Sequence, residues 1–283
     1  MKKPVVVVDL FCGMGGFTQG AIDAGAEVIM SVDAWDEACK VHEANHPGTR
    51  IDCIQLGNPD WYKGLLTFLK PYRGNFHIHL HGSPPCQALS NASNRDPSEG
   101  MPMVMWFLDL VKSVQPDSWS MENVVPMRKR LPEGTPTTIL NSADFGVPQT
   151  RRRCYAGVGW LAEPTRTKEE WVSVIEALPH LEGEQLRLEA TGSNAKRQAD
   201  TPLEEPSKTL CGSGNQVGPR VFDHEPEKPV RVRSLTLEET LVLQGFPSDY
   251  DLSSARTMKS RWTMVGNAVP PPVAEAVIRG IRQ

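Results

Sequence analysis

Short apolar segments with β propensity alternate with longer segments of helical spacing over the first 160 residues. Between the apolar segments, Asp36–Asn45 and Met101–Val114 place apolar residues at helical intervals. Strands that alternate with helices predict an α/β fold with a doubly wound, mostly parallel sheet. The expected strands are Val5–Asp9, Val28–Val32, Ile51–Ile54, Phe76–Leu80, Ser118–Met121 and Cys154–Val158.

The pattern changes after Trp160, where Pro and Gly interrupt a sequence of mixed charge as far as Pro229. Thr167–Glu170 has the capping-box pattern, and the apolar residues after it predict one short helix. These residues are Trp171, Val174, Ile175 and Leu178. Beyond them, Thr201–Gly218 contains little helical pattern. We therefore expect a small, loop-rich second domain.

Helical signals return near the carboxyl end of the chain. A second capping box, Thr236–Glu239, predicts a helix that ends at Gly245. The segment Gly266–Pro272 predicts a turn, and its last prolines suit the first turn of a final helix, Val273–Ile281.

Composition allows one large domain and a small one, since the chain has 283 residues of which 39% are hydrophobic. The formal net charge of -4 gives no overall indication of nucleic-acid binding. Basic residues cluster locally at Arg128–Arg130, at Arg151–Arg153 and in the C-terminal third. Such clusters are typical either of phosphate contacts or of ordinary solvated faces.

Six cysteines are present, and none forms a Cys-x-x-Cys pair, so we expect no metal site. No stretch approaches the ~20 apolar residues that span a membrane. We expect a cytoplasmic protein with free thiols.

The segment Gly82–Gln87 follows one of the expected strands and contains two consecutive prolines. The prolines stop the strand and stiffen the chain, so that Cys86 is presented from a rigid loop. Open α/β sheets place their sites at the carboxyl ends of strands. A thiol there is a candidate nucleophile, and the alternative is a buried structural cysteine.

A glycine-rich segment, Asp9–Gly16, follows the first expected strand and precedes a helix. Glycines in that position let the backbone turn tightly and approach a ligand. Asp33 follows Gly13 by twenty residues, at the end of the second strand, where a carboxylate can accept hydrogen bonds from both ribose hydroxyls of a nucleoside. The spacing is Gly-x-Gly-Gly, which favours S-adenosylmethionine over a dinucleotide.

Six sequence blocks, in order, resemble the motifs of the DNA (cytosine-5) methyltransferases. Together they span nearly all of the chain except about 160–230. The blocks are Asp9–Gly16, Pro84–Gln87, Glu122–Val124, Gln149–Arg153, Arg233–Pro247 and Gly266–Pro271.

The resemblance implies roles in catalysis for four residues. Cys86 would add to C6 of cytosine and make C5 nucleophilic, and Glu122 would hold or protonate N3. Arg153 would bind O2 and orient the base. Arg151 would lie either near the cysteine or on the phosphate backbone. For Glu122, the alternative from the sequence alone is a structural role in a helix cap or turn.

For S-adenosylmethionine, the resemblance implies contacts from the glycine turn, the ribose-binding aspartate, the loop around the nucleophile and the last motif. The residues are Phe11, Gly13, Met14, Gly16, Asp33, Pro85, Gln87, Asn267 and Val269. The residue that reads the adenine amino group stays open between Asn58, Asp60 and Asp52. Asp33 stands where the family more often has Glu.

The resemblance also implies an overall architecture, that of a class I, Rossmann-like methyltransferase. A cofactor-binding catalytic domain would comprise 1–158 plus 262–283, and a target-recognition domain would comprise 159–261. The expected activity is transfer of a methyl group to C5 of a flipped cytosine. The expected partner is double-stranded DNA, bound by a monomer associated with the nucleoid.

Two other functions stay open. One is an RNA cytosine-5 methyltransferase acting on tRNA, which the lack of a Cys-Phe-Thr tripeptide in the small domain disfavours. The other is a catalytically inactive relative that binds DNA or a partner, which the presence of all four catalytic residues disfavours.

The region between Trp160 and Arg231 has room for few side chains that read DNA. Each bidentate base contact gives about 1–3 kcal/mol of discrimination, so we expect a short target of about two to five base pairs, or a longer one read loosely. Many of these side chains would contact only phosphates. The candidates are Arg187, Lys196, Arg197, Lys208, Asn215, Gln216 and Arg220.

Overall fold

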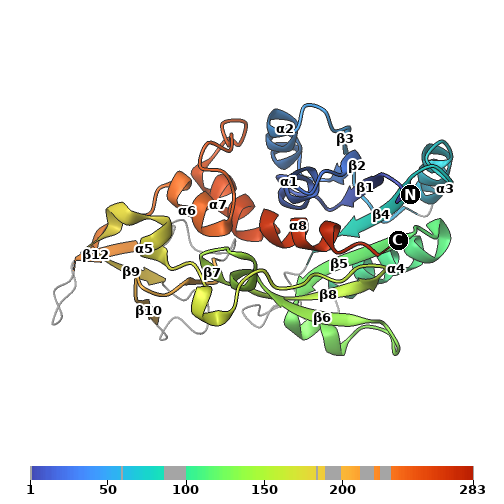
Figure 1. The fold of residues 1–283 in the computed structure, drawn as a ribbon. Helices are drawn as coiled ribbons and strands as arrows, with labels where there is room; N and C mark the ends of the chain where they lie inside the picture. Colours follow the sequence, from blue (N-terminus) through green and yellow to red (C-terminus); the bar gives the residue numbers. More distant parts are fainter. Residues whose placement is uncertain are drawn as a thin grey trace.

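The computed structural model describes residues 2–58, 60–85, 100–182, 184–188, 199–210, 220–223 and 231–282. Its centre is a seven-stranded sheet with the strand order β3-β2-β1-β4-β5-β8-β6 (Figure 1). Neighbours from β3 to β5 pair in parallel, whereas β8 pairs antiparallel with both β5 and β6. The predicted doubly wound, mostly parallel α/β sheet is confirmed.

All six predicted strands are present, most of them a residue or two longer than predicted. The strands of the sheet are β1 (Val5–Leu10), β2 (Glu27–Asp33), β3 (Ile51–Cys53), β4 (His77–Gly82), β5 (Ser118–Val124), β6 (Thr137–Asn141) and β8 (Arg152–Val158). The helices around it are α1 (Gly16–Asp23), α2 (Asp36–Asn45), α3 (Trp61–Leu69), α4 (Met101–Val114) and α8 (Pro271–Arg279). The alternation pattern did not predict β6, an edge strand with only one buried residue.

Each face of the sheet has its own core, because successive side chains of a strand point to opposite faces. Val6, Val8 and Leu10 of β1 pack with α3 and α4 on one face. Val7 packs on the other face with Phe17 of α1 and with α8. In a parallel sheet covered on both faces, consecutive residues of a strand must all be apolar, because they face the two cores in turn. The four valines Val5–Val8 meet this requirement in β1.

The rest of the chain builds a smaller unit at the other end of the molecule, seen around β9 and β12 in Figure 1. Its sheet has the order β10-β9-β12-β13, and its described pairs are antiparallel. The elements are β9 (Glu184–Leu188), β10 (Ala199–Thr201), β12 (Arg220–Asp223), β13 (Arg231–Ser234) and the helix α5 (Val174–Ala177). The short strands β7 (Gln149–Thr150) and β11 (Ser207–Lys208) pair with each other and join this unit to the large sheet.

The single helix predicted after Thr167 is wrong in extent. The capping box forms, but the 3-10 turn Lys168–Glu170 ends at Trp171, whose backbone is extended. The indole Nε1 of Trp171 donates a hydrogen bond of 2.9 Å to Asp144, which draws this residue away from a helical path. Ser173 then caps the separate helix α5. Tertiary contacts therefore override the local helical spacing.

The C-terminal helices differ slightly from prediction. The second capping box opens α6 (Leu237–Gln244), with Gly245 at its carboxyl end, as predicted. Helix α7 (Met258–Asn267) includes Gly266 and Asn267, so the predicted turn is shortened to Ala268–Pro270. The last helix begins two residues early at Pro271, since proline is favoured in a first helical turn.

Two smaller clusters show how the parts of the chain meet. Leu243 of α6 packs with α5 and with Leu203, in the cluster of the small unit. Leu241 of the same helix packs with α7 and with Met14 from the glycine loop. Helix α6 thus contacts both the small unit and the glycine loop. The domain boundaries 1–158, 159–261 and 262–283 stay predictions.

Candidate active site

The strand order reverses direction between β1 and β4, and open α/β sheets bind ligands at such a point. Leu10 and Gly82, the last residues of these strands, are partners in the sheet. The amide of Ser83 extends this pairing by donating to the Leu10 carbonyl at 3.1 Å. The glycine loop after β1 and the Pro84-Pro85 loop after β4 therefore begin side by side.

The glycine loop turns sharply through left-handed backbone conformations. Phe11 has φ of 56°, Gly13 of 54° and Gly15 of 98°. A side chain at Gly13 would meet no atom within 4 Å, so this glycine faces open space at the end of the sheet. Gly15 serves as the N-cap of α1. The loop has the shape that a ligand approaching its backbone requires.

Asp33, at the end of β2, holds this loop in place. Its two carboxylate oxygens accept hydrogen bonds of 2.8 Å from the backbone amides of Gly13 and Trp35. Each oxygen has a further lone pair available. The carboxylate is half-buried at the edge of the site, so binding a ribose is compatible with its role in the loop.

The turn after α7 lies directly against the start of α1. A Cβ atom built on Gly16 would lie 2.1 Å from the Val269 carbonyl oxygen, so only glycine fits there. This contact brings Asn267 to the same end of the sheet as the glycine loop, with its side chain exposed. The first and last motifs of the sequence thus meet in space, although Gly266 follows Gly16 by 250 positions.

Not every predicted cofactor residue directs its side chain toward this space. The Met14 side chain is buried in the cluster with α7, and Val269 is buried against α8. Phe11 is half-buried and makes an edge contact with Trp106, with ring centroids 6.0 Å apart. Pro85 is exposed. Cys86 and Gln87 lie outside the described residues.

Glu122, on β5, forms an ion pair with Arg153 on β8, with the Glu122 Oε1 and Arg153 Nε atoms 3.1 Å apart. Only 8% of Glu122 is exposed, and this burial raises the pKa of its carboxyl although Arg153 and Arg151 oppose the shift. A carboxyl with a raised pKa beside a fixed guanidinium is suited to sharing a proton with a bound base.

Asn123 connects this strand to the proline loop. Its side-chain Nδ2 donates a hydrogen bond of 3.0 Å to the Pro84 carbonyl. The loop that leads into Cys86 is therefore fixed to the strand that carries Glu122. Sequence reasoning did not assign this residue a role, although its place directly after Glu122 in the same sequence block was a signal for one.

Arg151 is almost fully buried, with 2% of its surface exposed. Its guanidinium donates hydrogen bonds to the Leu210 carbonyl at 2.9 Å and to the Ala268 carbonyl at 3.3 Å. Of the two roles expected for it, contact with the phosphate backbone does not fit a guanidinium enclosed in this way. Arg151 instead links β7, the small unit and the turn before α8.

A family model described as C-5 cytosine-specific DNA methylase matches residues 5–135 and 160–283 of the chain. The chain belongs to this family of methyltransferases. Membership supports DNA cytosine methylation as the general activity, with S-adenosylmethionine as the methyl donor that such enzymes use.

Curated relatives match this methylase along nearly its whole length. The type II methyltransferase M.MthTI of Methanothermobacter thermautotrophicus is 28% identical over 334 residues, covering 98% of this chain and 97% of the relative. M.HindV of Haemophilus influenzae is 29% identical over 302 residues, covering 97% and 95%. The solved structure of the S. pombe Dnmt2 methyltransferase has the same fold, with a TM-score of 0.68 at 18% identity and 97% of each chain covered.

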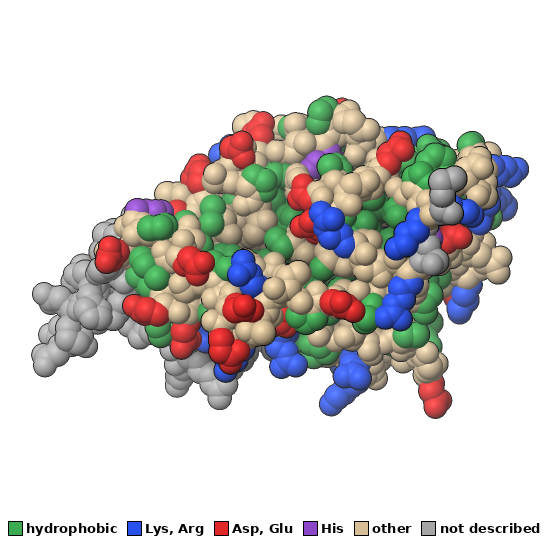
Figure 2. Space-filling view, viewed as in Figure 1, with side chains coloured by type: hydrophobic (Ala, Val, Ile, Leu, Met, Phe, Trp, Pro, Cys, Tyr) green, Lys and Arg blue, Asp and Glu red, His purple; other side chains and the backbone are tan. Residues whose placement is uncertain are grey.

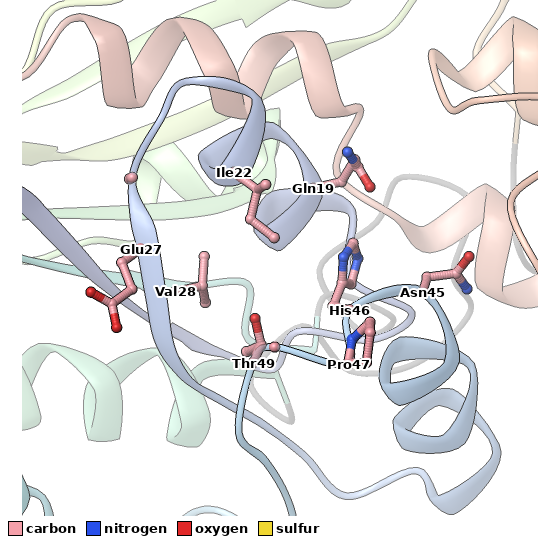
Figure 3. A pocket seen from close by; sticks show the side chains of 10 residues that line it. Gln19, Ile22, Glu27, Val28, Asn45, His46, Pro47 and Thr49 are labelled. Carbon is pink, nitrogen blue, oxygen red and sulfur yellow. The ribbon is translucent and has the colours of Figure 1, made fainter.

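A separate cavity of about 360 Å³ lies on this methylase between α1, the start of β2 and the end of α2 (Figure 3). Gln19, Ile22 and His46 are among its lining residues. It contains none of the predicted site residues, and it lies at the amino end of β2, whereas Asp33 lies at the carboxyl end.

The described residues contain neither a candidate metal site nor a membrane-spanning helix. No group of three or more His, Cys, Asp or Glu side chains there is placed to hold a metal ion. No helix in the same ranges is long and apolar enough to cross a membrane.

On the face seen in Figure 2, Lys and Arg side chains are interspersed with Asp and Glu. Among the predicted DNA-reading residues, Arg187 of β9 and Arg220 of β12 are partners across two strands, and Lys208 lies in β11. Lys196, Arg197, Asn215 and Gln216 fall outside the described residues.

Proposed function

We propose that this protein transfers a methyl group from S-adenosylmethionine to C5 of a cytosine flipped out of double-stranded DNA. It acts as a monomer, and Cys86 forms a covalent bond with C6 of the base. The observation that supports this most strongly is the junction of three motifs at the switch point of the sheet. There the glycine loop, the loop leading into Cys86 and the Glu122–Arg153 pair are held together by the hydrogen bonds of Ser83 and Asn123.

The residues present suit S-adenosylmethionine, which when bound supplies a methyl group on a positively charged sulfur. Open space at Gly13 lets a ligand approach the loop backbone, and Asp33 offers lone pairs for ribose hydroxyls. Asn267 adds an exposed amide at the same end of the sheet.

Three side chains of the protein act on the cytosine base, each in a different role. The Cys86 sulfur bonds to C6, and electron density moves through the ring toward C5 and N3. Glu122 donates a proton to N3 and later takes it back, and its raised pKa keeps that proton available. Arg153 orients the base through O2 while it holds the Glu122 carboxyl.

Replacing Asp33 tests the cofactor site. Hydrogen bonds to a charged group contribute about 1.5–3 kcal/mol each. We therefore expect Asp33→Ala to weaken S-adenosylmethionine binding at least about tenfold, because it removes both the ribose acceptor and the anchor of Gly13. Calorimetry measures the affinity, with Asp109→Ala, which removes an exposed carboxylate on α4, as the control. Unchanged affinity in a folded Asp33→Ala protein would place the ribose elsewhere.

The activity itself is tested by expression in a bacterium that lacks DNA methylation, followed by bisulfite sequencing of its genome. We expect one short motif of about two to five base pairs, methylated at a single cytosine. Unmodified DNA together with methylated tRNA would support the RNA methyltransferase instead. Absence of both products would indicate an inactive, binding protein.

A further inference from the structure

A continuous chain of hydrogen bonds runs along β4 and β5 through alternating histidines and serines. Ser118 Oγ lies 2.8 Å from both His77 Nε2 and His79 Nδ1. Ser120 Oγ lies 2.9 Å from His79 Nε2 and 2.8 Å from His81 Nδ1. The chain ends with His81 Nε2 at 2.9 Å from Ser83 Oγ. We call these six residues the His–Ser chain.

The middle of the His–Ser chain is closed to water, and its ends are less so. His79, His81, Ser118 and Ser120 are fully buried, whereas His77 is 7% exposed and Ser83 is half-buried. Phe17 of α1 covers the inner part, with its ring stacked 3.4 Å from the His81 ring. At the outer end, the charges of Asp117 and Lys3 act on the pKa of His77, which burial lowers.

Hydrogen-bond chemistry requires that all the hydrogen bonds of the His–Ser chain point in the same direction. A neutral imidazole has one N–H donor and one acceptor nitrogen, and a serine hydroxyl donates one hydrogen. Each serine between two histidines must therefore donate to one ring and accept from the other. The His–Ser chain therefore has two states. In one, His79 and His81 both carry their proton on Nε2, and in the other both carry it on Nδ1. Passage of one proton along the His–Ser chain converts one state into the other.

The inner end of the chain lies at the active site. In the parallel register, His81 pairs with Ser120 and Gly82 pairs with Met121. The residues that follow these pairs, Ser83 and Glu122, therefore come next to each other in the same register. Glu122 also lies on the face of β5 that carries Ser120, two residues earlier. Asn123 fixes the adjacent Pro84 carbonyl to the same strand.

We propose that the His–Ser chain carries the proton released by methylation out of the catalytic pocket to solvent at His77. This rests on the proposed function, because replacing hydrogen by methyl at C5 releases one proton in a pocket that the bound DNA closes. Ser83 Oγ accepts that proton and passes its own to His81 Nε2. His81 Nδ1 gives a proton to Ser120, and the same exchange through His79, Ser118 and His77 releases one at the outer end.

Every group in the chain is neutral before and after this transfer. Passage leaves each proton on the opposite ring nitrogen. After the DNA has left, a proton taken up from solvent at His77 passes back along the His–Ser chain and leaves through the open pocket, which restores the first state. Burial lowers the pKa of His79 to about 3. Burial also lowers the pKa of His81 well below its ordinary value, so both rings are neutral at rest and each accepts a proton on one nitrogen as it gives up the proton on the other.

A purely structural role for these buried histidines is the competing explanation, and His79→Gln separates the two. Glutamine retains one donor and one acceptor, but it cannot accept a proton at one atom and release another elsewhere. Ser120→Ala breaks the chain at a second point, and Ser120→Thr, which keeps the hydroxyl, is its matched control. Rapid quenching of one turnover with labelled S-adenosylmethionine measures methyl transfer and loss of the protein–DNA adduct separately.

We expect His79→Gln and Ser120→Ala to transfer the methyl group at the normal rate but to accumulate the methylated adduct, with its breakdown slowed at least about tenfold. Ser120→Thr should behave as the unaltered protein. Equal slowing of methyl transfer and breakdown, or no slowing, would overturn the relay. Failure of the unaltered protein to transfer any methyl group to DNA would instead contradict the proposed function.

Discussion

Cys86→Ala is expected to abolish methyl transfer while it leaves S-adenosylmethionine binding nearly intact. Cys86 supplies the bond to C6, whereas the glycine loop and Asp33 hold the cofactor. Loss of a nucleophile in another enzyme costs about 10⁶ in kcat, so we expect turnover to fall to background. Incorporation of labelled methyl groups into DNA measures the activity, and calorimetry measures cofactor affinity.

Cys154→Ala is the matched control for that substitution. Cys154 is a free, buried cysteine on β8, and its removal should leave methyl transfer close to normal. Substantial turnover by Cys86→Ala would show that another group adds to the base. Loss of cofactor binding together with turnover would show that the substitution disturbs the loop as a whole.

The sequence predicts the large sheet well because its strands are short, apolar and separated by helices with clear periodicity. Burial on both faces of a parallel sheet demands that composition, as Val5–Val8 show. The pairing of the glycine loop with the proline loop also follows, since both come after strands that end at the same edge.

The same reasoning misreads β4 in one respect. Phe76–Leu80 is predicted as an apolar run, yet His77, His79 and His81 alternate with Ile78 and Leu80. This period of two separates a polar face from an apolar one, and the polar face becomes the His–Ser chain only because β5 places serines opposite it. The spacing of residues within β4 does not reveal that the neighbouring strand will be β5, with serines opposite the histidines.

The second unit is less predictable because its structure depends on distant contacts. The sheet of β9, β10, β12 and β13 pairs segments separated by long connections. Gln149 bonds to the Leu243 carbonyl at 3.0 Å and to Gln244 Oε1 at 2.7 Å, and it accepts from the Leu210 amide. Gln244 in turn donates to the Ala268 carbonyl at 2.8 Å. Buried polar links of this kind have no local sequence signal.

Arg151→Ala is expected to destabilise the protein strongly, because Arg151 belongs to this buried network. The substitution removes the guanidinium that donates to the Leu210 carbonyl and one of the two side-chain donors to the Ala268 carbonyl, and it removes a large buried side chain. Each buried acceptor that loses its partner costs about 1–3 kcal/mol, so we expect the free energy of unfolding to fall by about 2–4 kcal/mol. Urea unfolding followed by tryptophan fluorescence measures the change.

Arg152→Ala provides the control from the same basic run. Arg152 is exposed, and surface substitutions change stability by about 0.5 kcal/mol or less. Arg151→Lys keeps the charge but loses the planar fork that reaches two carbonyls, so its stability should fall between the two. Equal stability of Arg151→Ala and Arg152→Ala would contradict the structural role. Because the Ala268 carbonyl belongs to the turn that follows Asn267, Arg151→Ala should also weaken S-adenosylmethionine binding, which Arg152→Ala should not.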